Sequence, residues 1–305
     1  MTSLLDRAAP PTALGAPVVA LDVGATSIKG AVVAASGERL ASVRRPTGRA
    51  DGPSAVLDRV VDLAVSLASS VSGVGAAGIA VCGAVDPSGL VTSVNLGWNG
   101  AAVGSLVESR LGVPVTVLND AHAGARGEGS FGAARGFGDY LYVSIGTGIG
   151  AAIVTDGHVR AGFHGHAGEL GHVRVDHPGR PCACGARGCL ETVMSAAALE
   201  ARWAGAPLTA REILDLVIAG DSAVSGLWTS AVDGLAAGLI SVISLLDPGV
   251  IVIGGGLSRT GTRLTGPLAR SMAEQSPSFH AGTELRLATL GDWSGCLGAA
   301  VGARG

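Results

Sequence analysis

The sequence is poor in charged residues and has no run of basic side chains. Only 15% of its 305 residues are Asp, Glu, Lys or Arg, and 21 basic residues face 24 acidic ones, which gives a net charge of -3. Proteins that bind nucleic acids usually carry a strongly basic patch that contacts the phosphates. The composition therefore argues against nucleic acid as a main partner.

Signals for secretion and for membrane insertion are also missing. The first 15 residues hold two adjacent prolines and lack the basic start and apolar stretch of a signal peptide. The longest apolar segment, 234–246, has 13 residues interrupted by serines, whereas a membrane-spanning helix needs about 20. We expect residues 1–16 to form a disordered lead, and the protein to be cytoplasmic without a membrane partner.

Cysteine is scarce, whereas glycine is abundant. Three of the five cysteines lie between Cys182 and Cys189, and an odd, clustered set suits a metal site better than a disulfide framework. The 49 glycines follow no three-residue period, which excludes collagen and indicates many tight turns. A chain of this length that is 48% hydrophobic can bury a sizeable core, which excludes general disorder.

Apolar strands alternate with helical periodicity, as in an α/β protein. Residues 18–33 read as a strand, a turn after Asp22 and a second strand, and residues 140–154 repeat this plan. The repeat predicts two related lobes facing each other across a cleft. We expect an N-terminal lobe at 17–118 plus 291–305 and a C-terminal lobe at 119–290.

Both strand-turn-strand segments place glycine and threonine where backbone N–H groups can approach an anion. Each turn alone is equally well explained as a simple hairpin, but two turns opposed across a cleft would hold the two ends of a polyphosphate. Neither turn fits a P-loop or a dinucleotide fingerprint, because no G-x-x-x-x-G-K-[ST] is present and a strand follows each turn. The candidate phosphate-binding residues are Asp22, Gly24, Thr26, Lys29, Gly146, Thr147 and Gly148.

Asp120 and a triple-glycine turn follow two further apolar strands. Asn119 and Asp120 come directly after strand 115–118, at the position where an α/β fold opens its binding site. A helix N-cap is the alternative explanation for this pair, whereas beside phosphate-binding turns Asp120 becomes the candidate base for phosphoryl transfer. The turn Gly254, Gly255 and Gly256 follows strand 250–253, and its backbone can lie against a flat ring or a ribose.

His172, Cys182, Cys184 and Cys189 predict a metal site in the loop 172–189. Three thiolates and one imidazole close a tetrahedron around Zn²⁺ and leave no position for a catalytic water, so the zinc would be structural. Three buried free thiols are the alternative. The remaining cysteines, Cys82 and Cys296, stand in apolar stretches and are expected in the core.

Three polar residues near these segments are candidates for a polyhydroxylated ligand. Glu169 precedes the metal-ligand histidine and Glu191 follows the last cysteine, and carboxylates accept hydrogen bonds from sugar hydroxyls. Asn95 can add an amide contact from the first lobe. The alternatives are solvated charges for the two glutamates, and for Asn95 a turn that packs the nearby Trp98.

Taken together, these segments resemble the ROK family, which combines sugar kinases with sugar-responsive repressors on the two-lobed actin-like ATPase (ribonuclease H-like) fold. The resemblance covers almost the whole chain from about Val18. It is carried by DVGATSIKG (22–30), GAVDPSGLV (83–91), NLGWNG (95–100), NDAHAGA (119–125), SIGTGIG (144–150), HAGELGHVRVD (166–176), CACGARGCLE (182–191) and GGGLS (254–258).

The resemblance implies an ATP-dependent hexose kinase with Asp120 as the base and Mg²⁺ bridging the phosphates. It places the GGGLS turn against adenosine and gives the sugar-holding role to Asn119, Glu169, His172 and Glu191. His172 would use one ring nitrogen for zinc and the other for a sugar hydroxyl. Members of the family are commonly dimers or dimers of dimers.

Four positions depart from the usual family pattern, namely Ala25, His122, Ala151 and Ala152. They bear on substrate preference and nucleotide affinity rather than on the reaction class. We expect transfer to the 6-hydroxyl of glucose, with N-acetylmannosamine or N-acetylglucosamine as alternative acceptors and polyphosphate as an alternative donor.

Two non-kinase functions are less well supported by the sequence. A repressor needs a helix-turn-helix domain ahead of Val18, but only about 16 residues with two adjacent prolines precede it. A sugar-sensing module without catalysis is disfavoured by the intact Asp120 and both phosphate turns.

Overall fold

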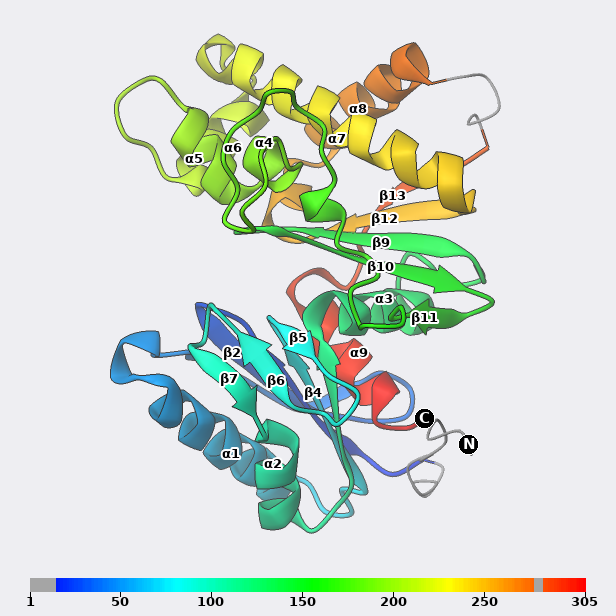
Figure 1. Cartoon of the computed structure of the whole chain (residues 1–305). Helices are drawn as coiled ribbons and strands as arrows, with labels where there is room; N and C mark the ends of the chain where they lie inside the picture. The colour runs from blue at the N-terminus through cyan, green and yellow to red at the C-terminus, as the bar shows by residue number, and fades with distance from the viewer. Residues whose placement is uncertain (1–14, 277–281) are drawn as a thin grey trace. The chain divides into compact units, whose positions relative to one another are not determined.

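The computed structural model describes residues 15–276 and 282–305, which divide into two compact units (Figure 1). Unit 1 contains the chain up to Gly132 together with Gly162–His166 and Asp292–Gly305, and unit 2 contains Ala133–Ala161 and Ala167–Gly291. The lead expected over residues 1–16 lies, except for its last two residues, outside the described residues. Each unit is built around its own five-stranded mixed sheet.

The sheet of unit 1 has the strand order β3-β2-β1-β4-β8. β1 pairs antiparallel with β2 and β2 with β3, whereas β1, β4 and β8 run parallel. A separate three-stranded sheet, β5-β6-β7, follows β4 along the chain. The strands are β1 (Val18–Val23), β2 (Ser27–Val33), β3 (Arg39–Pro46), β4 (Ala76–Val81), β5 (Ala84–Val85), β6 (Val91–Ser93), β7 (Trp98–Ala101) and β8 (Val115–Asn119).

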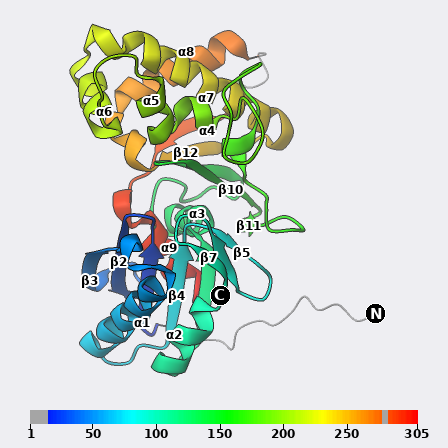
Figure 2. The same ribbon diagram turned by 60° about the vertical axis from the view of Figure 1, so that its left-hand side comes forward.

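Helices cover both faces of this sheet because side chains alternate along its strands. Ile79 belongs to the core formed with α1 and α2, whereas a side chain at Gly78 would meet the carbonyl of Ala299 in α9. α1 and α2 lie side by side, as both views show (Figures 1 and 2). The helices are α1 (Pro53–Ser70), α2 (Val103–Leu111), α3 (Asp120–Phe131) and α9 (Ser294–Gly302).

The sheet of unit 2 repeats this plan in the order β11-β10-β9-β12-β13. β11, β10 and β9 are antiparallel neighbours, and β9, β12 and β13 run parallel. This match confirms the predicted duplication. The elements are β9 (Tyr140–Ile145), β10 (Ile149–Thr155), β11 (His158–Arg160), β12 (Val250–Gly254), β13 (Glu284–Leu287), α4 (Glu191–Met194), α5 (Ala196–Arg202), α6 (Ala210–Ala219), α7 (Ser225–Leu246) and α8 (Thr262–Gln275).

Short 3₁₀ helices complete the two units, namely η1 (Arg49–Asp51), η2 (Leu170–His172), η3 (Ser222–Val224), η4 (Gly256–Thr260) and η6 (Gly291–Trp293). Two α-helices, α4 and α5, follow one another directly between Glu191 and Arg202. The break falls at Ser195, whose hydroxyl accepts the N–H of Ala198 at 3.0 Å and so caps the second helix.

One helical stretch, Ser222–Leu246, is apolar and long enough to count as a candidate membrane span by composition, with a mean hydropathy of 1.7. In unit 2 this stretch packs against α8 and α4. Trp228, Leu235 and Leu239 of α7 are buried in the main core of the unit. Packing inside the unit therefore accounts for the apolar composition of this helix.

Contacts place α3 in unit 1, whereas the expected boundary after residue 118 assigned this helix to the C-terminal lobe. The physical reason is the close packing of α3 on α9 (Figure 1). A Cβ atom at Gly298 would lie 1.6 Å from the carbonyl oxygen of Ala123, and one at Gly127 would lie 2.4 Å from that of Ser294. Only glycine allows the two helix backbones to approach this closely.

We expect Gly298→Ala to lower the free energy of unfolding by about 3 kcal/mol, because the added methyl group overpacks the α3–α9 contact. Chemical denaturation measures this change. Gly226→Ala in α7 is the matched control, since nothing lies within 4 Å of its Cβ position, and we expect it to be neutral or slightly stabilising. Equal stability of the two variants would contradict the packing described for α3 and α9.

Candidate functional site

The carboxyl ends of β1, β4 and β8 bring the first group of expected residues to one edge of the unit 1 sheet. The register pairs Val23 with Val81 and Val81 with Asn119, so Asp22 and Asp120 flank the end of β4. Cys82 lies between them, is partly buried and packs against the core of unit 1. Burial, together with the charges of Asp120 and Asp22, raises the pKa of the Cys82 thiol to about 12. Cys82 therefore stays protonated beside two carboxylates.

Asp22 is paired with the only lysine of the sequence. The Lys29 ammonium lies 2.7 Å from the Asp22 carboxylate, and both side chains are largely shielded, with 18% and 13% exposure. The pair joins β1 to β2 directly beside the first glycine turn. It places one cation where the sequence predicts phosphate binding.

The turn between β1 and β2 is fixed by Thr47, a residue that sequence reasoning missed. The N–H of Gly24 donates to the Ser27 carbonyl at 3.1 Å. The Thr47 hydroxyl donates to the Gly24 carbonyl at 2.7 Å, and its N–H donates to the Thr26 carbonyl at 3.0 Å. Thr47 is fully buried, and its two hydrogen bonds fix the conformation of the turn. No feature of the sequence around Thr47 indicates this role.

Asn119 and Asp120 have different structural roles at the start of α3. The Asn119 side chain accepts the N–H groups of Ala121 and His122 and donates to the Gly83 carbonyl at 3.1 Å, so it is the N-cap of α3. Asp120 is the first residue of α3, and its Oδ1 accepts the Ala121 N–H at 2.9 Å. The partial positive charge of a helix N-terminus favours an ionised carboxylate at this position.

Asn95 lies in the exposed turn between β6 and β7. Its carbonyl accepts a hydrogen bond from Arg49 at 3.3 Å. Nearby Trp98 is buried and donates its indole N–H to the Pro53 carbonyl, so the turn packs its tryptophan, and a sugar contact by Asn95 stays a prediction. Ser93 donates to the Cys82 carbonyl at 2.5 Å, which ties this turn to the edge that carries Asp22 and Asp120.

If this turn binds the phosphates of ATP, as the family resemblance implies, Lys29→Met should raise the KM for ATP roughly tenfold, because it removes the cation beside the turn and leaves the Asp22 carboxylate to repel the phosphates. Steady-state kinetics with the nucleotide varied at saturating sugar measures this effect. Arg135→Met is the control, since Arg135 is an exposed cation in unit 2 and should leave the KM unchanged. Equal KM values for wild type and Lys29→Met would remove the Asp22–Lys29 pair from the nucleotide site.

In unit 2, the second glycine turn and the triple-glycine turn share one edge of the sheet. The Gly146 N–H donates to the Gly148 carbonyl at 2.9 Å, which closes the turn between β9 and β10. β9 and β12 are parallel neighbours, and a Cβ at Gly255 would lie 2.4 Å from the carbonyl oxygen of Ile145. The predicted phosphate-binding and adenosine-binding turns, Gly146–Gly148 and Gly254–Gly256, are therefore adjacent.

Glu169 and Glu191, two of the residues expected to contact a sugar, lie against β10 in the same unit. Gly168 and Gly171 lie close to the backbone carbonyls of Ala151 and Ile149 in β10. Glu169, which lies between the two glycines in sequence, is therefore held near this strand. Glu191 begins α4 and accepts the N–H of Ile149 at 3.0 Å. Thr147, Cys182, Glu191 and Thr192 help to line a cavity of about 380 Å³. The lining of this cavity therefore includes residues of the second glycine turn, of the loop 172–189 and of α4.

The four expected metal ligands come together, with their ligand atoms all within 4.8 Å of one another. The Cys184 and Cys189 sulfurs are 3.7 Å apart, as are the Cys182 sulfur and Nδ1 of His172. Zinc with sulfur ligands at 2.3 Å and a nitrogen ligand at 2.0–2.1 Å would give tetrahedral edges of about 3.6 to 3.8 Å. The cluster therefore fits a closed tetrahedral Zn²⁺ site.

His172 directs its other ring nitrogen away from the cluster. Nε2 lies 3.8 Å from the Glu169 carboxylate, beyond hydrogen-bond distance. Both side chains are partly exposed. The two groups can therefore contact one polar ligand together while Nδ1 faces the Cys182 sulfur.

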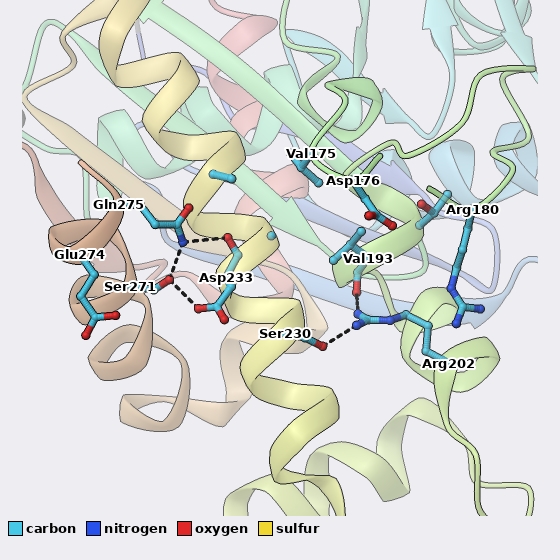
Figure 3. A pocket seen from close by; sticks show the side chains of 13 residues that line it. Val175, Asp176, Arg180, Val193, Arg202, Ser230, Asp233, Ser271, Glu274 and Gln275 are labelled. Atoms are coloured by element: carbon cyan, nitrogen blue, oxygen red, sulfur yellow. Dashed lines mark hydrogen bonds between the residues drawn. The ribbon is translucent and has the colours of Figure 1, made fainter. Parts of the chain in front are cut away.

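A larger cavity of about 700 Å³ lies between the loop 172–189, called the metal loop below, and the helices α7 and α8 (Figure 3). Its polar side chains largely bind one another: Ser271 donates to Asp233, Gln275 donates to Ser271, and Arg202 donates to Ser230 and to the Val193 carbonyl. The cavity contains none of the residues expected from the sequence. It shares Thr192 and Arg180 with the smaller cavity described above.

Comparison with known proteins decides the family. The model of the ROK family matches residues 18–305. The chain belongs to the ROK family. A glucokinase of Halalkalibacterium halodurans is 32% identical to this ROK protein over 305 residues, covering 92% of each chain.

Solved structures agree with this assignment. A ROK family glucokinase of Streptomyces griseus, solved in complex with glucose and AMPPNP, superposes with a TM-score of 0.84 at 31% identity, covering 94% of this chain and 99% of that one. A ROK hexokinase of Thermus thermophilus gives a TM-score of 0.80 at 33% identity, covering 94% and 97%. The expected α/β, actin-like ATPase fold is thereby confirmed.

Relatives with other functions also match this ROK protein. An N-acetyl-D-glucosamine kinase of Haemophilus influenzae is 32% identical over 255 residues, covering 78% of this chain and 83% of that protein. A xylose repressor of Bacillus subtilis is 29% identical over 242 residues, covering 77% and 63%. The family alone therefore leaves the acceptor sugar open.

Proposed function

We propose that this ROK protein is an ATP-dependent hexose kinase that transfers the γ-phosphoryl group to the 6-hydroxyl of a hexose, with glucose as the preferred acceptor. The observation that carries the proposal is the shared sheet edge in unit 1, where Asp120 stands at a helix N-terminus and the Asp22–Lys29 pair flanks the first turn. Glucokinases among the relatives that match the chain nearly end to end support the same class.

The chemistry of phosphoryl transfer requires positioning and charge neutralisation. In the proposed mechanism the N–H groups of both glycine turns and the Lys29 ammonium bind the phosphates, and Gly254–Gly256 lies against the adenosine. Mg²⁺ bound with ATP would neutralise phosphate charge, and the Asp22 carboxylate would hold it, directly or through water. Asp120 accepts the proton of the attacking hydroxyl.

In this proposal polar side chains hold the sugar. Glu169, His172 and Glu191 accept from or donate to its hydroxyls, and Asn119 and Asn95 add amide contacts. The Asn119 amide is already used by the α3 cap and by Gly83, so it has one N–H left to donate. The Zn²⁺ assigned to His172, Cys182, Cys184 and Cys189 is structural and fixes the orientation of the imidazole.

A coupled assay with purified protein tests the proposed function. Glucose, N-acetylmannosamine and N-acetylglucosamine are offered with ATP or with polyphosphate. We expect glucose with ATP to give the highest kcat/KM. A clear preference for an N-acetylhexosamine, as the Haemophilus influenzae relative suggests, would change the acceptor, and no turnover with any pair would favour a sugar-sensing protein without catalysis.

We further propose that the enzyme is cytoplasmic and forms a homodimer or a dimer of dimers, without nucleic acid or membrane partners. The match to glucokinases over nearly the whole chain supports this assignment. Light scattering of the purified protein measures the assembly, and a single protomer mass would contradict it.

A further inference from the structure

The Glu191 carboxylate lies directly against the second glycine turn. Its Oε2 accepts the N–H of Ile149, the residue that follows the turn, at 3.0 Å. A Cβ at Gly148 would lie 2.3 Å from the same oxygen, so the glycine leaves room for the carboxylate. Among the described residues, Oε1 has no hydrogen-bond partner. One carboxylate thus holds the turn with one oxygen and leaves the other for a ligand.

The backbone of Glu191 is fixed by the metal loop. Leu190 donates its N–H to the Val173 carbonyl at 2.9 Å, and Thr192 donates its N–H to the Cys189 carbonyl at 2.9 Å. Cys189 is itself one of the four clustered ligands. The metal loop therefore sets where the Glu191 carboxylate stands, although 42 residues separate it from Ile149.

The turn has a second link to the same region. The N–H of Ala196, at the start of α5, donates to the Gly146 carbonyl at 2.8 Å. The two ends of the turn are thus attached to residues 191 and 196 on either side of Ser195, and Ser195 is almost fully buried. The shape of the turn depends on this support rather than on its own sequence alone.

We propose that Glu191 is a positioning residue for the second phosphate turn in addition to a sugar contact, so that a single carboxylate couples the sugar site to the nucleotide site. This inference rests on the proposed kinase function. A sugar hydroxyl that binds Oε1 of Glu191 contacts the same carboxylate whose Oε2 accepts the N–H of Ile149 and so orients the turn. By reciprocity, sugar and nucleotide should each strengthen the binding of the other.

The test measures nucleotide binding without sugar, which a pure sugar contact would not influence. Isothermal titration with Mg²⁺ and a non-hydrolysable ATP analogue compares wild type with Glu191→Ala, Glu191→Gln and Glu191→Asp. We expect Glu191→Ala to weaken nucleotide binding roughly tenfold, the loss typical of a charge-assisted hydrogen bond. Glu191→Gln should bind the nucleotide nearly as well as wild type, because its amide oxygen can accept the Ile149 N–H, while its KM for the sugar rises.

The Glu191→Asp variant tests whether the length of the side chain, and not only its negative charge, is needed for the hydrogen bond to Ile149. It keeps the negative charge, but a side chain shorter by one methylene group cannot reach Ile149 from the same backbone position. We therefore expect Glu191→Asp to bind the nucleotide more weakly than Glu191→Gln. Glu274→Ala, which removes an exposed carboxylate on α8, is the matched control and should bind as wild type does.

The outcomes distinguish this inference from the proposed function. If wild type binds no nucleotide, the kinase proposal fails. If wild type binds and Glu191→Ala binds equally well, the positioning role is wrong. If Glu191→Ala loses its zinc or unfolds, the Gln and Asp variants decide, and equal nucleotide affinities of these two would overturn the inference.

Discussion

Replacing Asp120 by asparagine is expected to lower kcat about a thousandfold, which is the range expected when a general base is removed. Asparagine cannot accept the proton of the attacking hydroxyl. It can still accept the Ala121 N–H that Asp120 now accepts at 2.9 Å, so the start of α3 should persist. The measurement is steady-state turnover with saturating hexose and ATP, alongside thermal unfolding.

Asp58→Asn is the matched control for this experiment, because Asp58 is an exposed carboxylate on α1 of the same unit. It should leave kcat unchanged. A fully active Asp120→Asn variant would remove Asp120 from the role of base. The remaining interpretation would be that positioning and charge neutralisation alone supply the rate.

Replacing Cys189 by alanine is expected to remove the metal and nearly all activity. Cys189 is fully buried and contributes one of the four clustered ligands, so the remaining three cannot close the tetrahedron. His172 then loses its fixed orientation, and Glu191 loses the loop that holds its backbone. We expect about one zinc per chain in wild type, almost none in the variant, and roughly a hundredfold lower kcat/KM.

Elemental analysis of the purified proteins measures the zinc, and the coupled assay measures the activity. Cys296→Ala is the control, since Cys296 is buried in unit 1, outside the cluster, and donates to the Ala20 carbonyl. It should retain the zinc. A Cys189→Ala protein with normal zinc content would show that the cluster is a set of free thiols.

Local spacing was sufficient to predict the metal cluster and the two hairpins. Cys182, Cys184, Cys189 and His172 lie within one loop, so short loops alone bring them together. The two hairpins were visible because each combines two apolar strands with a glycine-containing turn. The same locality explains the prediction of Asp120 at a strand end, since the strand and the helix that flank it are continuous in sequence.

Contacts between distant segments could not be predicted in this way. Nothing near Thr47 indicates that it braces a turn about 20 residues earlier. Nor does the sequence around Glu191 reveal its hydrogen bond to Ile149. The assignment of α3 to unit 1 depends on the approach of Gly298 to Ala123, and that contact joins the C-terminal end of the chain to a helix near its middle. Strands of two to four residues, such as β5 and β6, are too short for periodicity to reveal.

The most direct test of the account is a crystal structure with glucose and a non-hydrolysable ATP analogue bound. The account predicts the 6-hydroxyl of glucose within hydrogen-bond distance of the Asp120 carboxylate and the phosphates bound at Gly24–Thr26 and at Gly146–Gly148. Phosphates bound away from both turns, or a sugar whose hydroxyls do not reach Asp120, would contradict it.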